Sequence, residues 1–213
     1  MKYQAVIFDL DGVICSTDRY HYQAWKALAD KLEAPFDEQV NNRLRGVSRM
    51  ESLAIVLEKY PRTLSAQEKQ ALAEEKNTVY RELLHKMGKE DLSDDVKNTL
   101  ENLRQAGLKL AIGSSSKNAP FILERIGLSD FFDTVADGNH ISKSKPDPEV
   151  FLLAAERIGI APEYCLVVED AKAGVEAAVA GGFEAAAIGD AYGDDRAAYH
   201  LKKFSDLLSC VLT

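Results

Sequence analysis

Two aspartates separated by one residue, Asp9 and Asp11, directly follow the short apolar run Ala5–Phe8 and precede Gly12. An apolar, partly β-branched run bounded by an Asp/Gly cluster is typical of a buried strand that ends in a polar loop. Carboxylates at such a position can serve as a nucleophile, as an acid or base, or as ligands of a hard cation. Alone, the pair is equally typical of a helix cap or an ordinary loop.

A calcium-binding loop of the EF-hand type is excluded by spacing. Such a loop needs glycine at its sixth position and glutamate at its twelfth. With Gly12 at the sixth position, Ile7 becomes the first ligand; with Asp9 at the first position, Tyr20 becomes the last. Neither Ile7 nor Tyr20 fits the role, so the acidic pair needs another explanation.

Polar residues also follow later apolar runs of the chain. Hydroxyl and amide side chains occur at 114–118, the acidic pair Glu169 and Asp170 follows another run, and Lys145 precedes Pro146. If these ends meet at one edge of a sheet, several carboxylates crowd together, and a divalent cation would offset their repulsion. Oxygen ligands without His or Cys favour a hard ion, and Mg²⁺ binds a few carboxylates together with water and substrate phosphate. The sequence therefore predicts a magnesium site for a phosphorylated substrate.

The elements that must position these side chains alternate along the chain. Apolar runs predict strands at 5–8, 108–112, 166–168 and 185–188, and helical patterns between them end at Gly107, Gly127 and Gly159. Strands alternating with helices indicate a parallel sheet that is covered on both faces. In such sheets ligands bind beyond the carboxyl ends of the strands. We therefore expect an α/β fold with a Rossmann-like parallel sheet core and helices on both faces.

Residues 16–92 interrupt this alternation. Trp25, Leu28, Ala29 and Leu32 form one apolar stripe at helical spacing, and capping boxes at 48–51 and 65–68 each open a further helix. The sequence predicts an inserted helical cap domain at 16–92 and a catalytic core domain formed by 1–15 and 93–213.

Composition excludes several classes of protein. The chain has 213 residues, a net charge of −8 and a pI near 5.1, which argues against nucleic-acid binding. No apolar stretch reaches the length of a membrane span, and no signal peptide is evident. The three cysteines, Cys15, Cys165 and Cys210, are widely spaced and are expected to be reduced. We expect a cytoplasmic monomer.

The motifs together resemble those of the haloacid dehalogenase superfamily. They are FDLDG at 8–12, IGS at 112–114, KPDP at 145–148 and VED at 168–170. Within that superfamily the chain is similar to the β-phosphoglucomutase family, through Thr17, His21, Trp25, 45–49, Lys76, Asn77 and 116–120. Most of these latter residues fall in the predicted cap, where that family selects its substrate.

The resemblance implies a role for each of the catalytic residues. Asp9 is the nucleophile that becomes an aspartyl phosphate, and Asp11 is the general acid and base, which Thr17 and His21 steady. Ser114 and Lys145 hold the oxygens of the transferring phosphoryl group. Mg²⁺ is implied to bind Asp9, the main-chain carbonyl of Asp11, Glu169 and Asp170. The alternative for His21 is simple packing in the cap beside Trp25.

Substrate contacts are implied in the same way. Arg49, Ser116, Lys117 and Asn118 form a second phosphate site, for which guanidinium and amide donors are suited. Further contacts to the sugar or the closing cap are implied for Trp25, Arg45, Gly46, Val47, Ser52 and Lys76. The alternative for Arg49 is a solvated surface residue.

The expected activity is interconversion of β-D-glucose 1-phosphate and glucose 6-phosphate through β-D-glucose 1,6-bisphosphate. The main alternative is a magnesium-dependent sugar-phosphate phosphatase, in which water attacks the aspartyl phosphate; a catalytically silent binding protein is a third possibility. Two departures from the family pattern bear on this. Ser93, Asp94 and Asp95 stand where many relatives have Pro-Gly, which affects the cap hinge, and Arg45 stands where lysine is frequent, which affects substrate preference.

Overall fold

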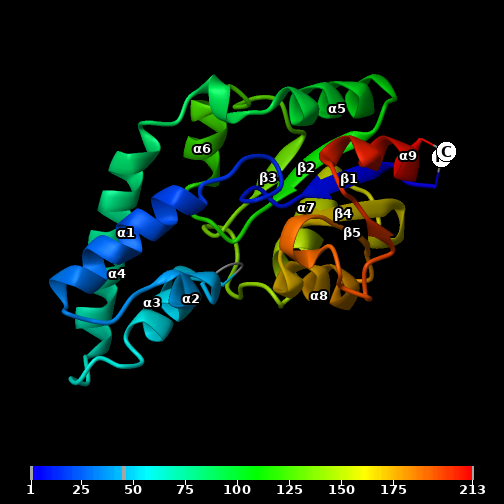
Figure 1. The fold of residues 1–213 in the computed structure, drawn as a ribbon. Helices are drawn as coiled ribbons and strands as arrows, with labels where there is room; N and C mark the ends of the chain where they lie inside the picture. The colour runs from blue at the N-terminus through cyan, green and yellow to red at the C-terminus, as the bar shows by residue number, and fades with distance from the viewer. Residues whose placement is uncertain (1, 45–46, 213) are drawn as a thin grey trace.

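The computed structural model describes residues 2–44 and 47–212. Within these residues the chain forms a parallel sheet of six strands in the order β3-β2-β1-β4-β5-β6, flanked by helices (Figure 1). The strands are β1 (Ala5–Phe8), β2 (Lys109–Gly113), β3 (Thr134–Ala136), β4 (Cys165–Glu169), β5 (Glu184–Ala187) and β6 (Tyr199–His200). The helices are α1 (Asp18–Lys31), α2 (Glu38–Asn42), α3 (Arg49–Val56), α4 (Ala66–Leu84), α5 (Asp94–Gln105), α6 (Ala119–Arg125), α7 (Glu149–Ile158), α8 (Lys172–Ala180) and α9 (Leu207–Val211).

The central strands are buried on both faces, because successive side chains of a strand point to opposite sides. Val6 and Phe8 of β1 belong to a hydrophobic cluster with residues of α5, α6 and α9. Ala5 and Ile7 belong to a second cluster with residues of α7 and α8. The sheet is thus a middle layer between two layers of helices, which confirms the predicted α/β fold.

Helices α1 to α4, here called the cap helices, stand to one side of the sheet (Figure 1). They enclose a third hydrophobic cluster that includes Trp25, Leu28, Leu53 and Ala73. The ends of α1 and α4 nearest the sheet pack into the first cluster instead, through residues such as Tyr20 and Leu84. The boundaries of the two domains at residues 16 and 92 stay a prediction.

Local sequence signals placed most element ends correctly. Ser48 with Glu51 and Ser65 with Glu68 form the two predicted capping boxes, at the starts of α3 and α4. The glycine after α7 adopts the left-handed conformation expected of a helix end, with φ of 70° at Gly159. Strands β3 and β6 were not predicted, because they have three and two residues and lie at the sheet edges.

No helix in the described part of the chain combines the length and apolarity that a membrane crossing requires. The three cysteines are free thiols, two of them buried.

Candidate active site

A single cleft of about 970 Å³ lies at the carboxyl ends of β1, β2 and β4 and extends to the cap helices. It gathers most of the side chains that the sequence singled out, although they are distant along the chain. The predicted residues that line it are Asp9, Asp11, His21, Trp25, Val47, Arg49, Ser52, Lys76, Ser114, Ser116, Lys117, Asn118, Lys145, Glu169 and Asp170. Thr17 is buried and binds Asp11. Arg45 and Gly46 lie outside the described residues.

Asp9 is the first residue after β1 and continues the sheet pairing, since its N–H donates to the carbonyl of Val168 at 3.0 Å. Its carboxylate accepts a hydrogen bond from the Lys145 ammonium, which also donates to Glu169 Oε1 at 2.6 Å. All three side chains are buried. The sheet therefore presents a carboxylate and an ammonium in direct contact at the floor of the cleft.

Burial and crowding perturb these acids. Burial raises the pKa of Asp9, the Lys145 ammonium opposes that rise, and the Glu169 carboxylate adds to it. Burial also raises the pKa of Asp170 to about 8, with Asp9 and Glu169 adding to the rise. The predicted acidic residues lie together, since Asp9 and Glu169 bind the same ammonium and both act on the pKa of Asp170.

The same crowding tests whether the residues suit Mg²⁺. No three Asp, Glu, His or Cys side chains among the described residues converge as a finished metal site, and Lys145 lies between Asp9 and Glu169. The donors at this edge of the sheet are nevertheless all oxygens, and their charges repel one another. A hard divalent cation would relieve that repulsion, so the donor chemistry fits magnesium.

Gly12 is required by the close approach of Asp170. Its φ of +88° lies in the left-handed region, and a Cβ at this position would stand 2.0 Å from Asp170 Oδ2. Any side chain would therefore displace the carboxylate as well as strain the backbone. This explains why glycine follows the two aspartates.

Asp11 has different surroundings from Asp9. The Thr17 hydroxyl donates to Asp11 Oδ1. Burial raises the pKa of Asp11 to about 6, against the lowering effect of the Thr17 hydrogen bond. A carboxyl that titrates near 6 can both give and take a proton close to neutral pH.

The cap helices contribute a buried basic cluster. Lys76 Nζ lies 3.0 Å from His21 Nδ1 and 4.7 Å from the centre of the Trp25 ring. Burial lowers the pKa of His21 well below its usual value and lowers the pKa of Lys76 to about 7, with Arg49 adding to both effects. Both shifts favour the uncharged forms of His21 and Lys76, which share a hydrogen bond between Nδ1 and Nζ.

Two residues of the predicted second phosphate site already have partners on α4. Arg49, the first residue of α3, forms an ion pair with Glu74 at 2.9 Å. Asn118 Nδ2 donates to Asn77 Oδ1 at 3.0 Å, which joins the loop after β2 to the cap helices. Glu74 and Asn77 are three residues apart and so lie on the same face of α4.

Sequence reasoning missed several residues of the cleft. Glu74 and Tyr80 line it beside Lys76, and the His21 and Tyr80 rings are 4.1 Å apart between centres. Helical spacing from Lys76 contained the signal for Tyr80, which follows it by four residues. Nothing in the local sequence distinguished Glu74 from its neighbour Glu75, which is also exposed but does not line the cleft.

Comparisons with known proteins agree with this geometry. A family model described as haloacid dehalogenase-like hydrolase matches residues 3–182. The chain is 41% identical over 192 residues to a β-phosphoglucomutase of Bacillus subtilis strain 168, covering 87% of this chain and 83% of that protein. It is 35% identical over 184 residues to a phosphorylated carbohydrates phosphatase of Thermotoga maritima, covering 85% and 82%.

Among solved structures, a β-phosphoglucomutase from Clostridium difficile matches with a TM-score of 0.91 and 36% identity, covering 96% of this chain and 93% of that chain. Similar proteins thus include both mutases and a phosphatase.

Proposed function

Because the chain belongs to the haloacid dehalogenase-like hydrolase family, we propose that it is a phosphomutase that interconverts β-D-glucose 1-phosphate and glucose 6-phosphate. The observation that carries the proposal is that one cleft is lined both by Asp9 and by a second group of phosphate donors, Arg49 and the 116–118 loop. A ligand with two phosphates, such as β-D-glucose 1,6-bisphosphate, would engage both groups.

In the proposed reaction the Asp9 carboxylate attacks phosphorus and forms an aspartyl phosphate, so that one difficult displacement becomes two easier ones. Asp11 gives a proton to the departing sugar oxygen and, in the return step, removes one from the attacking hydroxyl. Its raised pKa of about 6 supports both directions. Ser114 and Lys145 bind the oxygens of the group in transfer.

The proposed ligands of Mg²⁺ are Asp9, the main-chain carbonyl of Asp11, Glu169 and Asp170. When bound, the ion supplies positive charge to the nucleophile and the phosphoryl oxygens. Support comes from the all-oxygen donor set and the crowding of its charges. Removal of divalent ions with EDTA is expected to abolish turnover, and added Mg²⁺ to restore it.

Thr17 and His21 are proposed to orient Asp11 and the cap, while Trp25, Val47, Ser52 and Lys76 contact the sugar. All but Thr17 line the cleft. The roles of Arg45 and Gly46, the monomeric state and the cytoplasmic location remain predictions from the sequence.

The second candidate function is hydrolysis of sugar phosphates, favoured by the 35% identity to the Thermotoga maritima phosphatase. Both activities share the aspartyl phosphate and differ in whether a sugar hydroxyl or water attacks it. The second phosphate site favours the mutase, because hydrolysis of a monophosphate does not require it.

One assay separates these functions. The protein is incubated with Mg²⁺, β-D-glucose 1-phosphate and a trace of β-D-glucose 1,6-bisphosphate, and glucose 6-phosphate and free phosphate are followed. The mutase predicts glucose 6-phosphate with little free phosphate. Free phosphate in proportion to substrate, without glucose 6-phosphate, would establish the phosphatase instead. Asp9→Asn is expected to abolish either activity.

A further inference from the structure

The loop at 137–140 follows β3 and lies beside the 114–118 loop, which follows β2. The two strands pair in parallel, with Gly113 opposite Ala136, so both loops leave the sheet at the same edge. Ser114 N–H extends the pairing by one residue, donating to the carbonyl of Ala136 at 3.0 Å. No residue of 137–140 was expected to take part in the site.

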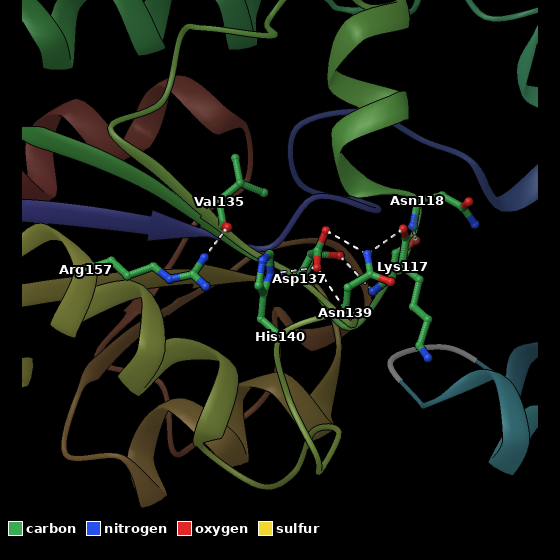
Figure 2. Close-up of polar contacts among 9 residues, drawn as sticks. Lys117, Asn118, Val135, Asp137, Asn139, His140 and Arg157 are labelled. Carbon is green, nitrogen blue, oxygen red and sulfur yellow. Dashed lines mark hydrogen bonds and ion pairs between the residues drawn. The ribbon is translucent and has the colours of Figure 1, made fainter.

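Two contacts connect the 137–140 loop to the main chain of the 114–118 loop. Gly138 N–H donates to the Ser116 carbonyl at 3.3 Å. Asn139 Nδ2 donates to the Lys117 carbonyl at 3.0 Å (Figure 2). Both bonds engage main-chain atoms, so the side chains of Ser116 and Lys117 stay available to a ligand. Figure 2 shows the Lys117 side chain extending away from Asn139.

Asp137 holds Asn139 in place. Its carboxylate is fully buried and accepts from Asn139 N–H at 2.8 Å and from Asn139 Nδ2 at 3.2 Å (Figure 2). His140 Nδ1 accepts from the Asp137 main-chain N–H at 3.3 Å, which also holds the turn of this loop. A buried carboxylate is costly unless it is hydrogen-bonded, so these contacts stabilise one conformation of the loop. That conformation directs the Asn139 amide at Lys117.

Gly138 allows the two loops to touch. A Cβ at this position would lie 2.4 Å from the main-chain oxygen of Ser115 and 3.1 Å from the Lys117 nitrogen. The obstacle at Ser115 is backbone, which cannot rotate aside as a side chain can. Any residue with a side chain would therefore push the 115–117 segment away.

We propose that Asp137, Gly138 and Asn139 are positioning residues that set the geometry of the second phosphate site through the main chain of Ser116 and Lys117. This inference rests on the proposed function, because that function makes Ser116, Lys117 and Asn118 phosphate ligands. Asp137, Gly138 and Asn139 affect substrate selectivity, because they favour substrates with a second phosphate. They are not needed for phosphoryl transfer to Asp9 from a donor that has no second phosphate.

The test compares two phosphoryl donors, β-D-glucose 1,6-bisphosphate and acetyl phosphate, which has no second phosphate. Asn139→Ala removes the hydrogen bonds from Nδ2 to the Lys117 carbonyl and to the Asp137 carboxylate. Loss of these contacts is expected to raise KM for the bisphosphate about fivefold. We expect kcat, and the rate with acetyl phosphate, to stay within about twofold of the wild type.

Gly138→Ala is a second variant, and Gly193→Ala is its matched control. Gly193 has nothing within 4 Å of a Cβ and no left-handed φ, so the added methyl group meets open space there. Gly138→Ala is expected to raise the bisphosphate KM at least as much as Asn139→Ala, and Gly193→Ala to leave it unchanged. Thermal unfolding of each variant shows whether a change in KM is due to misfolding.

The outcomes separate the two proposals. If folded Asn139→Ala reacts less well with both donors to the same extent, or equally well as the wild type with both, the positioning role is wrong. The mutase proposal would still stand. The Asp9→Asn variant binds either donor without turning it over, so calorimetry can compare their affinities. If this variant bound the bisphosphate no more tightly than acetyl phosphate, the protein would have no second phosphate site. Both proposals would then be wrong.

Discussion

At the scale of single residues, two aspartates two positions apart have different environments. Asp9 contacts a buried ammonium, whereas Asp11 accepts from a neutral hydroxyl and has a pKa of about 6. The difference arises because the chain leaves the sheet between them, so that they face different neighbours. Such a difference in environment is what the proposed function requires, in which Asp9 forms a covalent bond and Asp11 moves protons.

Asp11→Asn is expected to lower the kcat of the mutase by about 10²- to 10⁴-fold, because an amide cannot transfer a proton. Phosphorylation of Asp9 by acetyl phosphate should survive, since its leaving group needs little proton donation. Steady-state kinetics and mass spectrometry of the intact protein measure the two quantities. Undiminished kcat in this variant would contradict the acid–base role.

Glu74→Gln tests how Arg49 is held when the site is empty. The Arg49–Glu74 ion pair keeps the guanidinium on α4, so a ligand phosphate must compete with a carboxylate. Without that carboxylate we expect KM for β-D-glucose 1-phosphate to fall by about two- to fivefold, in keeping with a partly exposed pair.

Glu75→Gln is the matched control, because Glu75 pairs with Lys31 at 2.6 Å and does not line the cleft. Its KM should equal that of the wild type. A rise in KM for Glu74→Gln alone would mean that Glu74 orients Arg49 for the phosphate and does not compete with it.

At the scale of elements, hydrogen bonds hold the loops that follow the short strands against neighbouring helices. Asp194, in the loop after β5, binds Arg196, which also contacts Glu176 and the Lys172 carbonyl of α8. This network connects the loop to the helix that follows the Glu169 and Asp170 pair. It lies away from the cleft and should affect stability without affecting chemistry.

The pH dependence of Asp194→Asn tests that network. The hydrogen bond from Arg196 lowers the pKa of Asp194 to about 2, so the folded state favours the carboxylate. Its stabilisation is present above the ordinary value near 3.8 and is lost as the pH falls toward 2. Asp194→Asn should lower the free energy of unfolding at pH 7 by about 1 kcal/mol, and less at pH 3.

Urea unfolding at both pH values measures this difference, with Asp195→Asn as the neighbouring exposed control. A destabilisation of Asp194→Asn that is as large at pH 3 as at pH 7 would show that the charge of Asp194 is not its source.

At the scale of the whole molecule, the cleft depends on how the cap helices meet the sheet layer. Arg125, at the end of α6, donates to the main-chain carbonyls of His85 and Met87, just beyond α4. The 114–118 loop leads into the other end of α6. This helix therefore connects the proposed second phosphate site to the point where the chain returns from the cap helices.

Arg125→Ala should loosen that connection and admit water to the aspartyl phosphate. We expect the ratio of free phosphate to glucose 6-phosphate to rise several-fold while phosphorylation of Asp9 continues. Arg157→Ala is the control, because Arg157 of α7 also donates to a main-chain carbonyl, that of Val135 in β3 at 2.8 Å, and makes no hydrogen bond with the described residues of the cap helices (Figure 2). An equal rise in both variants would contradict a specific role for the α6 connection.

Sequence reasoning reached the fold and most of the cleft because its signals are local. The strand before Asp9, the capping boxes at Ser48 and Ser65 and the helix end at Gly159 each depend on residues within a few positions. Edge strands β3 and β6 were not predicted, because two or three residues carry no periodic pattern. The role of the loop after β3, with Asp137 and Asn139, was not predicted for the same reason.

The sequence by itself determined which groups could do chemistry: a strand followed by Asp9 and Asp11, a lysine before proline, and an acidic pair after another strand. Only the tertiary structure decided which of them meet and with what charge. The contact of Lys145 with Asp9 joins residues 136 positions apart, and Lys145 also binds Glu169, 24 positions away. Burial, together with the charge of the distant Asp9, raises the pKa of Asp170. Burial and long-range contacts produce these properties, and neither can be read from neighbours along the chain.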